Sequence, residues 1–123
     1  MTLGTALSAA PAPGQGNPET DAVRRAALDY VEGFYEGDST KHVRSIHPSV
    51  YKYGFFYREN ESRYSGSQMT WDGFLAYSRR IRETGRGTAP AGAPKEVVIH
   101  EVLDQTASAK VTAFWGIDYL LLA

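Results

Sequence analysis

The chain has 123 residues, no cysteine and a formal net charge of −1. Its length is sufficient for one domain with a single core, and the absence of cysteine excludes thiolate metal sites, thiol nucleophiles and disulfides. The near-neutral charge argues against bulk attraction to nucleic acid or anionic membranes, and no stretch approaches the roughly 20 apolar residues that span a bilayer.

Residues 1–18 are small, uncharged and rich in proline and glycine. Such a segment buries too little apolar surface to offset the entropy of ordering, so we expect a flexible tail. The stretch 3–12 also resembles the second half of a secretory signal peptide, although the basic region that should precede it is missing. We therefore expect a cytoplasmic protein, with export as the alternative if the true start lies upstream.

A first helix is predicted after this tail. Asn17 and Thr20 are both candidate N-caps, and Pro18 suits a first-turn position. Apolar residues then recur at spacings of three and four, which indicates an amphipathic helix of about 17 residues. Gly33 interrupts it at a cost of about 1 kcal/mol. This glycine indicates close approach of a backbone or a ligand, or a loosened helix end before Gly37.

A second, short helix is predicted over 39–46, with Asp38 as its N-cap. Pro48 ends it because the residue before a proline avoids helical dihedrals. β-rich runs at 51–57 and 64–69 then predict two strands joined by polar residues. We expect His42, on the short helix, to be solvated.

Thr70 is the candidate N-cap of a third helix, and residues 85–94 predict a flexible loop. Two long strands are predicted beyond it, at 96–103 and 108–122. The second strand alternates strictly, so its apolar residues share one face. Helices followed by strands indicate an α+β fold, in which a curved antiparallel sheet packs against three helices from the N-terminal half. Such a sheet closes into a cone around an aromatic-rich hollow.

Three local motifs resemble a known family: residues 29–38 (DYVEGFYEGD), residues 46–48 (IHP) with Lys52 after them, and residues 109–111 leading to Trp115 and residues 118–120. The order of elements resembles the NTF2-like superfamily, which includes SnoaL-like cyclases and ketosteroid isomerases. The motifs themselves resemble the putative lumazine-binding family. The resemblance implies an NTF2-like cone that binds a small planar organic molecule and forms a homodimer.

Members of this family usually continue into a further strand after the one that ends this chain. The resemblance therefore implies that the domain, residues 19–123, lacks its final strand. An apolar run that ends abruptly would leave an unpaired edge. We expect truncation, with cover by another subunit as the alternative.

Aromatic residues are abundant, with eight Tyr, five Phe and two Trp. They indicate either an ordinary aromatic core or the wall of a ligand site, because cores and pockets recruit the same side chains. If these residues line a ligand site, we expect it to bind a planar heterocycle. We expect no cofactor. The expected lining residues come from the first helix, the hairpin and the last strand: Tyr30, Phe34, His47, Tyr53, Phe55, Trp115 and Tyr119.

His47 is the best candidate for a catalytic residue, because imidazole exchanges protons readily near neutral pH. The alternative is that it bonds a helix-end carbonyl and helps to stop the helix. Unbroken alternation puts the carboxylate of Asp118 on the face opposite Trp115 and Tyr119, unless a bulge near Gly116 reverses the register. Without an inward-facing carboxylate, we favour binding over catalysis, with an isomerase, cyclase or dehydratase as the alternative.

The same alternation predicts which residues share the outer sheet face, and the resemblance implies that this face pairs two copies of the chain. A purely structural dimerisation domain is therefore a third hypothesis. No metal site is expected, because the three histidines lie on separate elements and no H-x-x-x-H helix pair exists. The residues of the predicted dimer face are Lys110, Thr112, Phe114 and Asp118.

Overall fold

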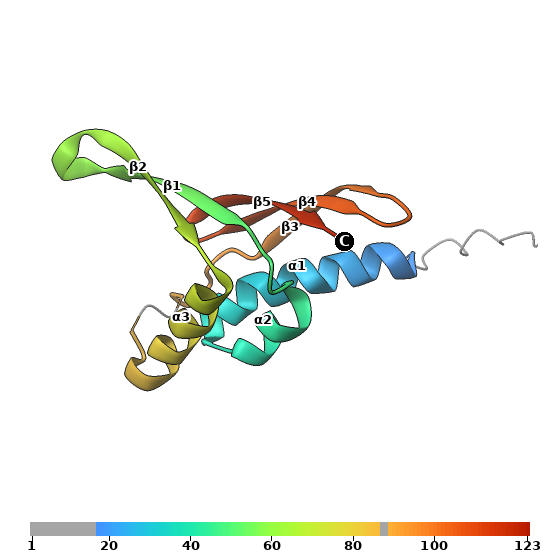
Figure 1. Ribbon diagram of the computed structural model, residues 1–123, viewed down its shortest axis with the longest axis horizontal. Helices are drawn as coiled ribbons and strands as arrows, with labels where there is room; N and C mark the ends of the chain where they lie inside the picture. The colour runs from blue at the N-terminus through green and yellow to red at the C-terminus, as the bar shows by residue number, and fades with distance from the viewer. Residues whose placement is uncertain (1–16, 87–88) are drawn as a thin grey trace, which may run out of the picture.

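The computed structural model describes residues 17–86 and 89–123 (Figure 1). Helices packed beneath antiparallel strands confirm the α+β prediction. The predicted tail, up to residue 16, and part of the predicted loop 85–94 lie outside the described residues. The elements are α1 (Pro18–Glu36), α2 (Ser39–Ser45), β1 (Lys52–Arg58), the 3-10 turn η1 (Glu59–Glu61), β2 (Arg63–Met69), α3 (Trp71–Thr84), β3 (Glu96–Val102), β4 (Ala107–Ala113) and β5 (Gly116–Leu122).

The helix α1 begins and ends at residues suited to those positions. The side chain of Asn17 accepts a hydrogen bond from the Glu19 N–H at 2.9 Å, which satisfies one of the free amides of the first turn. Pro18 follows at a position where a missing N–H is harmless. At the other end Gly37 adopts the left-handed conformation, with φ 65°, and its N–H bonds to the Gly33 carbonyl. Asn17, not Thr20, is therefore the cap.

His42 of α2 is fully buried, with 0% of its surface exposed. Its Nε2–H donates to the Tyr30 carbonyl at 2.9 Å, and its ring packs edge-on against Phe34 with centroids 4.4 Å apart. The prediction that His42 is solvated is wrong, because α2 turns this face toward α1. Burial lowers the pKa of His42, an effect that the bond to the Tyr30 carbonyl partly offsets.

Gly33 allows α2 to approach α1. A Cβ added there would lie 2.2 Å from Cδ2 of His42, which is far inside van der Waals contact. The close approach that the sequence indicated is therefore made by a side chain, neither by a backbone nor by a ligand.

We expect Gly33→Ala to lower the free energy of unfolding by about 2 kcal/mol, because overpacking a buried site outweighs the better helix propensity of alanine. Urea denaturation followed by circular dichroism measures the change. Gly54→Ala is the matched control, since no atom lies within 4 Å of a Cβ added there. A Gly33→Ala protein as stable as the control would contradict this packing.

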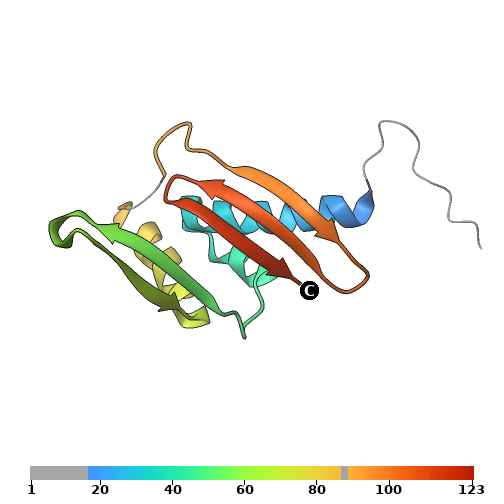
Figure 2. The same ribbon diagram turned by 90° about the horizontal axis from the view of Figure 1, so that it is seen from above.

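The strands form two separate antiparallel sheets in the described residues (Figure 2). β1 and β2 form a hairpin closed by η1, and β3, β4 and β5 form a meander with β4 in the centre. β5 is the edge of the meander nearest the hairpin (Figure 2). The single curved sheet of the prediction is thus divided in two, and both parts lie on the same side of the helices (Figure 1).

The predicted strand 108–122 is wrong, because the chain reverses within it. A two-residue turn, Phe114–Trp115, joins β4 to β5 and pairs Ala113 with Gly116. Gly116 has φ 130°, a conformation that favours glycine. The reversal gives no ordinary signal, since two-residue turns usually contain asparagine, aspartate or glycine rather than two aromatic residues.

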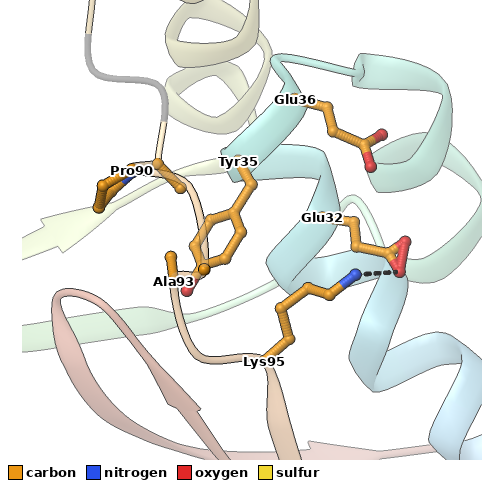
Figure 3. A pocket seen from close by; sticks show the side chains of 8 residues that line it. Glu32, Tyr35, Glu36, Pro90, Ala93 and Lys95 are labelled. Atoms are coloured by element: carbon orange, nitrogen blue, oxygen red, sulfur yellow. Dashed lines mark ion pairs between the residues drawn. The ribbon is translucent and has the colours of Figure 1, made fainter.

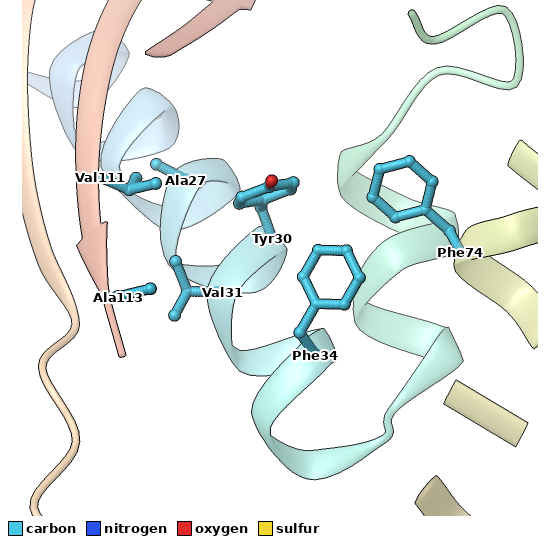
Figure 4. Close-up of a cluster of buried hydrophobic side chains, with 7 residues drawn as sticks. All are labelled: Ala27, Tyr30, Val31, Phe34, Phe74, Val111 and Ala113. Carbon is cyan, nitrogen blue, oxygen red and sulfur yellow. The ribbon is translucent and has the colours of Figure 1, made fainter. Parts of the chain in front are cut away.

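The hydrophobic core lies between α1, α3 and β4 (Figure 4). Phe34 packs against Phe74 with ring centroids 5.2 Å apart, and only 5% of Phe34 is exposed. Tyr30 and Phe34, predicted to line a ligand site, are therefore core residues over most of their surface. The members of the cluster are Ala27, Tyr30, Val31, Phe34, Phe74, Val111 and Ala113.

Candidate functional site

Three side chains from separate elements converge on one carboxylate oxygen, Oδ2 of Asp118. The Tyr30 hydroxyl donates to it at 2.6 Å, and the Lys52 ammonium and the Trp115 indole N–H each donate at 3.0 Å. Lys52 also donates to the Tyr30 hydroxyl oxygen, and its Nζ lies 5.1 Å from the centre of the Tyr30 ring. We call these four residues the Asp118 cluster.

The position of each member follows from local structure. Tyr30 lies on the face of α1 turned toward the strands, and Lys52 is the first residue of β1. Asp118 points to the helix side of β5 because it pairs with the buried Val111 of β4. The turn at Phe114–Trp115 therefore reverses the register in the way that a bulge near Gly116 would have done.

The cluster is polar but only partly buried. The side chains of Lys52 and Asp118 retain 22% and 20% of their exposure, so both are within reach of a small molecule. Burial alone raises the pKa of the Asp118 carboxyl, but hydrogen bonds from Tyr30 and Lys52 outweigh it and hold this pKa below its ordinary value. Burial and the adjacent Asp118 charge raise the pKa of the Tyr30 phenol. The cluster is therefore a carboxylate surrounded by neutral and cationic donors near neutral pH.

Residues 18–123 match the family described as "Putative lumazine-binding". The chain belongs to this family. Its α+β architecture is consistent with the NTF2-like fold that the sequence motifs implied. No curated protein and no solved structure matches the chain.

In this member of the putative lumazine-binding family, only part of the predicted lining set comes together. Trp115 and Tyr30 both belong to the Asp118 cluster, and Phe34 packs beneath it at 5.3 Å from the Trp115 ring centroid. Tyr53 and Phe55 lie on the opposite face of β1 from Lys52, because side chains alternate along a strand. They form an exposed aromatic face of the hairpin, and Phe55 is 74% exposed.

Tyr119 lies on the outer face of β5, next to Asp118 in sequence but on the other side of the sheet. It pairs with Lys110 of β4 and is 77% exposed. The expected grouping of Trp115 with Tyr119 on one face is wrong, because it assumed a continuous strand. The same error put Asp118 beside Lys110 and Thr112. These two stay on the outer face, and Phe114 lies in the turn.

His47 is exposed and its Nδ1 accepts a hydrogen bond from the Ser49 N–H at 3.0 Å. It therefore stabilises the turn that follows α2, and no contact joins it to the Asp118 cluster in the described residues. Lys52 was given no role by residue-by-residue reasoning, although it stands in the second family motif. The signal that could have identified it is a lysine at the start of an otherwise aromatic strand.

A second polar network lies on the other side of α1. Arg44 holds the buried Asp29 carboxylate at 2.6 Å, and Arg25 and Lys41 bond Glu32 at 2.9 Å and 2.7 Å. Hydrogen bonding to Arg44 lowers the pKa of Asp29. Burial opposes the same effect at Glu32, but the bonds from Lys41 and Arg25 outweigh it and lower the pKa from 4.5 to about 2. These carboxylates, both in the first motif, are structural.

Glu32 also borders a surface cavity of about 280 Å³ (Figure 3). Lys95 faces Glu32 across it at 3.5 Å, and Glu36 is paired with Lys41 at 3.0 Å. We assign no ligand to this cavity, because its charged groups are already paired. A second cavity of about 300 Å³, between the start of α1, the β3–β4 turn and the end of β5, contains no predicted site residue.

Within residues 17–86 and 89–123, no group of three or more histidine, aspartate or glutamate side chains is placed to hold a metal ion. No helix in that part of the chain is long and apolar enough to cross a membrane.

Proposed function

We propose that the protein binds a small planar heterocycle at the Asp118 cluster. The observation that carries this proposal is the convergence of three donors on a partly exposed carboxylate, beside an indole that is 37% exposed. An aromatic edge with a few fixed polar groups is the usual composition of a small-molecule site. Membership of the putative lumazine-binding family supports lumazine and related ring systems as the first ligands to test.

Fluorescence titration of the full chain tests this proposal. The chain contains two tryptophans, Trp71 and Trp115, so Trp71→Phe isolates the signal of Trp115 and Trp115→Phe provides the control. We expect lumazine and flavins to quench Trp115 with micromolar or lower dissociation constants, because a bound ring would stack on or beside its indole. If no planar heterocycle in the panel binds with micromolar affinity, the proposal is wrong.

An enzyme of isomerase, cyclase or dehydratase type is the second candidate. The favouring observation is the 2.6 Å hydrogen bond between the Tyr30 phenol and the Asp118 carboxylate, since a carboxylate base beside a phenol donor is an arrangement used for proton transfer. His47, the candidate that the sequence indicates, is the alternative base. Turnover that persists unchanged in both Asp118→Asn and His47→Gln would exclude the reaction from this site.

Dimerisation through the outer face of the β3–β5 sheet is a compatible third proposal. Ile117, Tyr119 and Leu121 project from β5 onto this face and are 54%, 77% and 92% exposed, and exposed apolar patches of this kind often mark protein contacts. Light scattering of wild-type and Leu121→Asp protein tests it. A wild type that is monomeric at all concentrations would refute the dimer.

A cytoplasmic location stays a prediction, which fractionation of the native host would test.

A further inference from the structure

The hydrogen bonds of the Asp118 cluster leave two groups open. All three donors reach Oδ2 of Asp118, and within the described residues no hydrogen bond reaches Oδ1. Lys52 donates two bonds, to Asp118 and to the Tyr30 hydroxyl, of the three that an ammonium group can make. The free acceptor, Oδ1 of Asp118, therefore lies beside the free N–H donor of Lys52, since Nζ of Lys52 is 3.0 Å from Oδ2 of the same carboxylate.

This pair of open groups restricts the ligand that fits. A ligand carboxylate would face the negative charge of Asp118, and an amidine or guanidine would face the positive charge of Lys52. A ring with only acceptors would leave the carboxylate oxygen without a partner, which is unfavourable once water is displaced. The complementary group is a donor next to an acceptor, and the two site charges together favour a neutral one.

We infer that the Asp118 cluster recognises the N–H–C=O edge of a cyclic amide or imide, with Oδ1 of Asp118 accepting from the ring N–H and Lys52 donating to the neighbouring carbonyl. This inference rests on the proposed function and adds the class of ligand. It includes the uracil-like ring of pteridinediones and flavins. It excludes planar aromatics that lack a ring N–H beside a carbonyl.

Methylated lumazines test the inference on the wild-type protein. One derivative carries methyl groups on the two ring nitrogens of the dione ring, and its isomer carries both on carbons of the distal ring. We expect the N-methylated compound to bind roughly 10- to 100-fold more weakly than lumazine, the loss expected for one charge-assisted hydrogen bond. The C-methylated isomer controls for bulk and should bind within a few-fold of lumazine.

Variants provide an independent measurement. In Asp118→Asn the three donors keep the amide oxygen at the Oδ2 position, so an NH₂ group replaces the accepting Oδ1 and meets the ligand N–H donor to donor. Lys52→Met removes the donor to the carbonyl. Each should weaken lumazine binding roughly 10- to 100-fold. The matched controls, Asp104→Asn in the β3–β4 turn and Lys110→Met on the outer sheet face, should leave it unchanged.

The outcomes separate the two levels of the proposal. If N-methylated and C-methylated lumazines bind equally tightly, the edge recognition is wrong while heterocycle binding stands. If Asp118→Asn and Lys52→Met fold and bind lumazine as the wild type does, the site is wrong. If no heterocycle binds at all, the proposed function fails and the inference fails with it.

Discussion

Replacing Phe74 by alanine is expected to reduce the free energy of unfolding by about 3–5 kcal/mol, the range observed for large cavities in cores. Phe74 is fully buried and its ring contacts Phe34, Tyr30 and His42, with centroids 5.2 Å, 6.3 Å and 5.4 Å away. It thus joins α3 to both other helices. Thermal unfolding of the variant should shift down by roughly 12 °C or more.

Phe55→Ala is the matched control for this prediction. Phe55 has the same side chain but is 74% exposed on the hairpin, and substitutions at such positions usually change stability by about 0.5 kcal/mol or less. A Phe55→Ala protein as unstable as Phe74→Ala would show that the hairpin face is covered in solution. It would contradict the placement of Phe74 in the core and of Phe55 on the surface.

The second large effect on stability is expected when Glu32 loses its charge, either in acid or by substitution. The lowered pKa of Glu32, about 2 instead of 4.5, means that the unfolded chain binds the proton first as the pH falls. The stabilisation by this carboxylate is therefore complete above about pH 5 and is lost between about pH 4.5 and pH 2. A shift of this size corresponds to a stabilisation of about 3 kcal/mol. Solvent screens the half-exposed Arg25, so the expected contribution of Glu32 to stability is about 2 kcal/mol.

Glu32→Gln should accordingly be about 2 kcal/mol less stable at pH 7, and the Glu32 contribution should be missing from its acid denaturation. Asp29 and Asp118, whose pKa values are also lowered, titrate in both proteins and cancel in the difference. The difference from wild type should approach zero near pH 2. Urea denaturation across the pH range measures it. Glu36→Gln is the control, because the Glu36 side chain is 49% exposed and surface ion pairs contribute about 0–1 kcal/mol. A constant difference between wild type and Glu32→Gln at every pH would contradict the assignment.

The helices could be predicted because their signals are local. Asn17, Asp38 and Thr70 each cap the helix that they were expected to begin or precede, since a capping side chain bonds an amide two or three residues away. The glycine that ends α1 is equally local. Long-range contacts gave no such signal. His42 follows Lys41 and lies two residues before Arg44, which indicates a solvated position, but contacts with Phe34 and Gly33 of α1 and with Phe74 of α3 bury it.

The candidate site could be predicted only in part, because it depends on contacts between distant residues. Trp115 and Tyr30 were predicted from their aromatic character, and both donate a hydrogen bond to Asp118. Asp118 was assigned to the wrong face because the pattern of alternation runs smoothly through Phe114 and Trp115. Phe114 and Trp115 are both apolar and therefore fit the pattern of a strand. Periodicity alone does not distinguish one strand of fifteen residues from two strands of seven. The pairing of Val111 with Asp118 decides between them.

The length of the turn between β4 and β5 determines which face of the sheet Asp118 occupies. Inserting one codon after Trp115, with the turn itself retained, would move every residue of β5 by one position against β4. Asp118 would then face outward beside Lys110, and Ile117 would take its place opposite Val111, because successive side chains of a strand alternate between faces. A single in-frame insertion could thus replace the acidic centre of the cluster by a hydrocarbon without changing any existing residue. Relatives that differ in length at this turn should therefore differ in ligand chemistry.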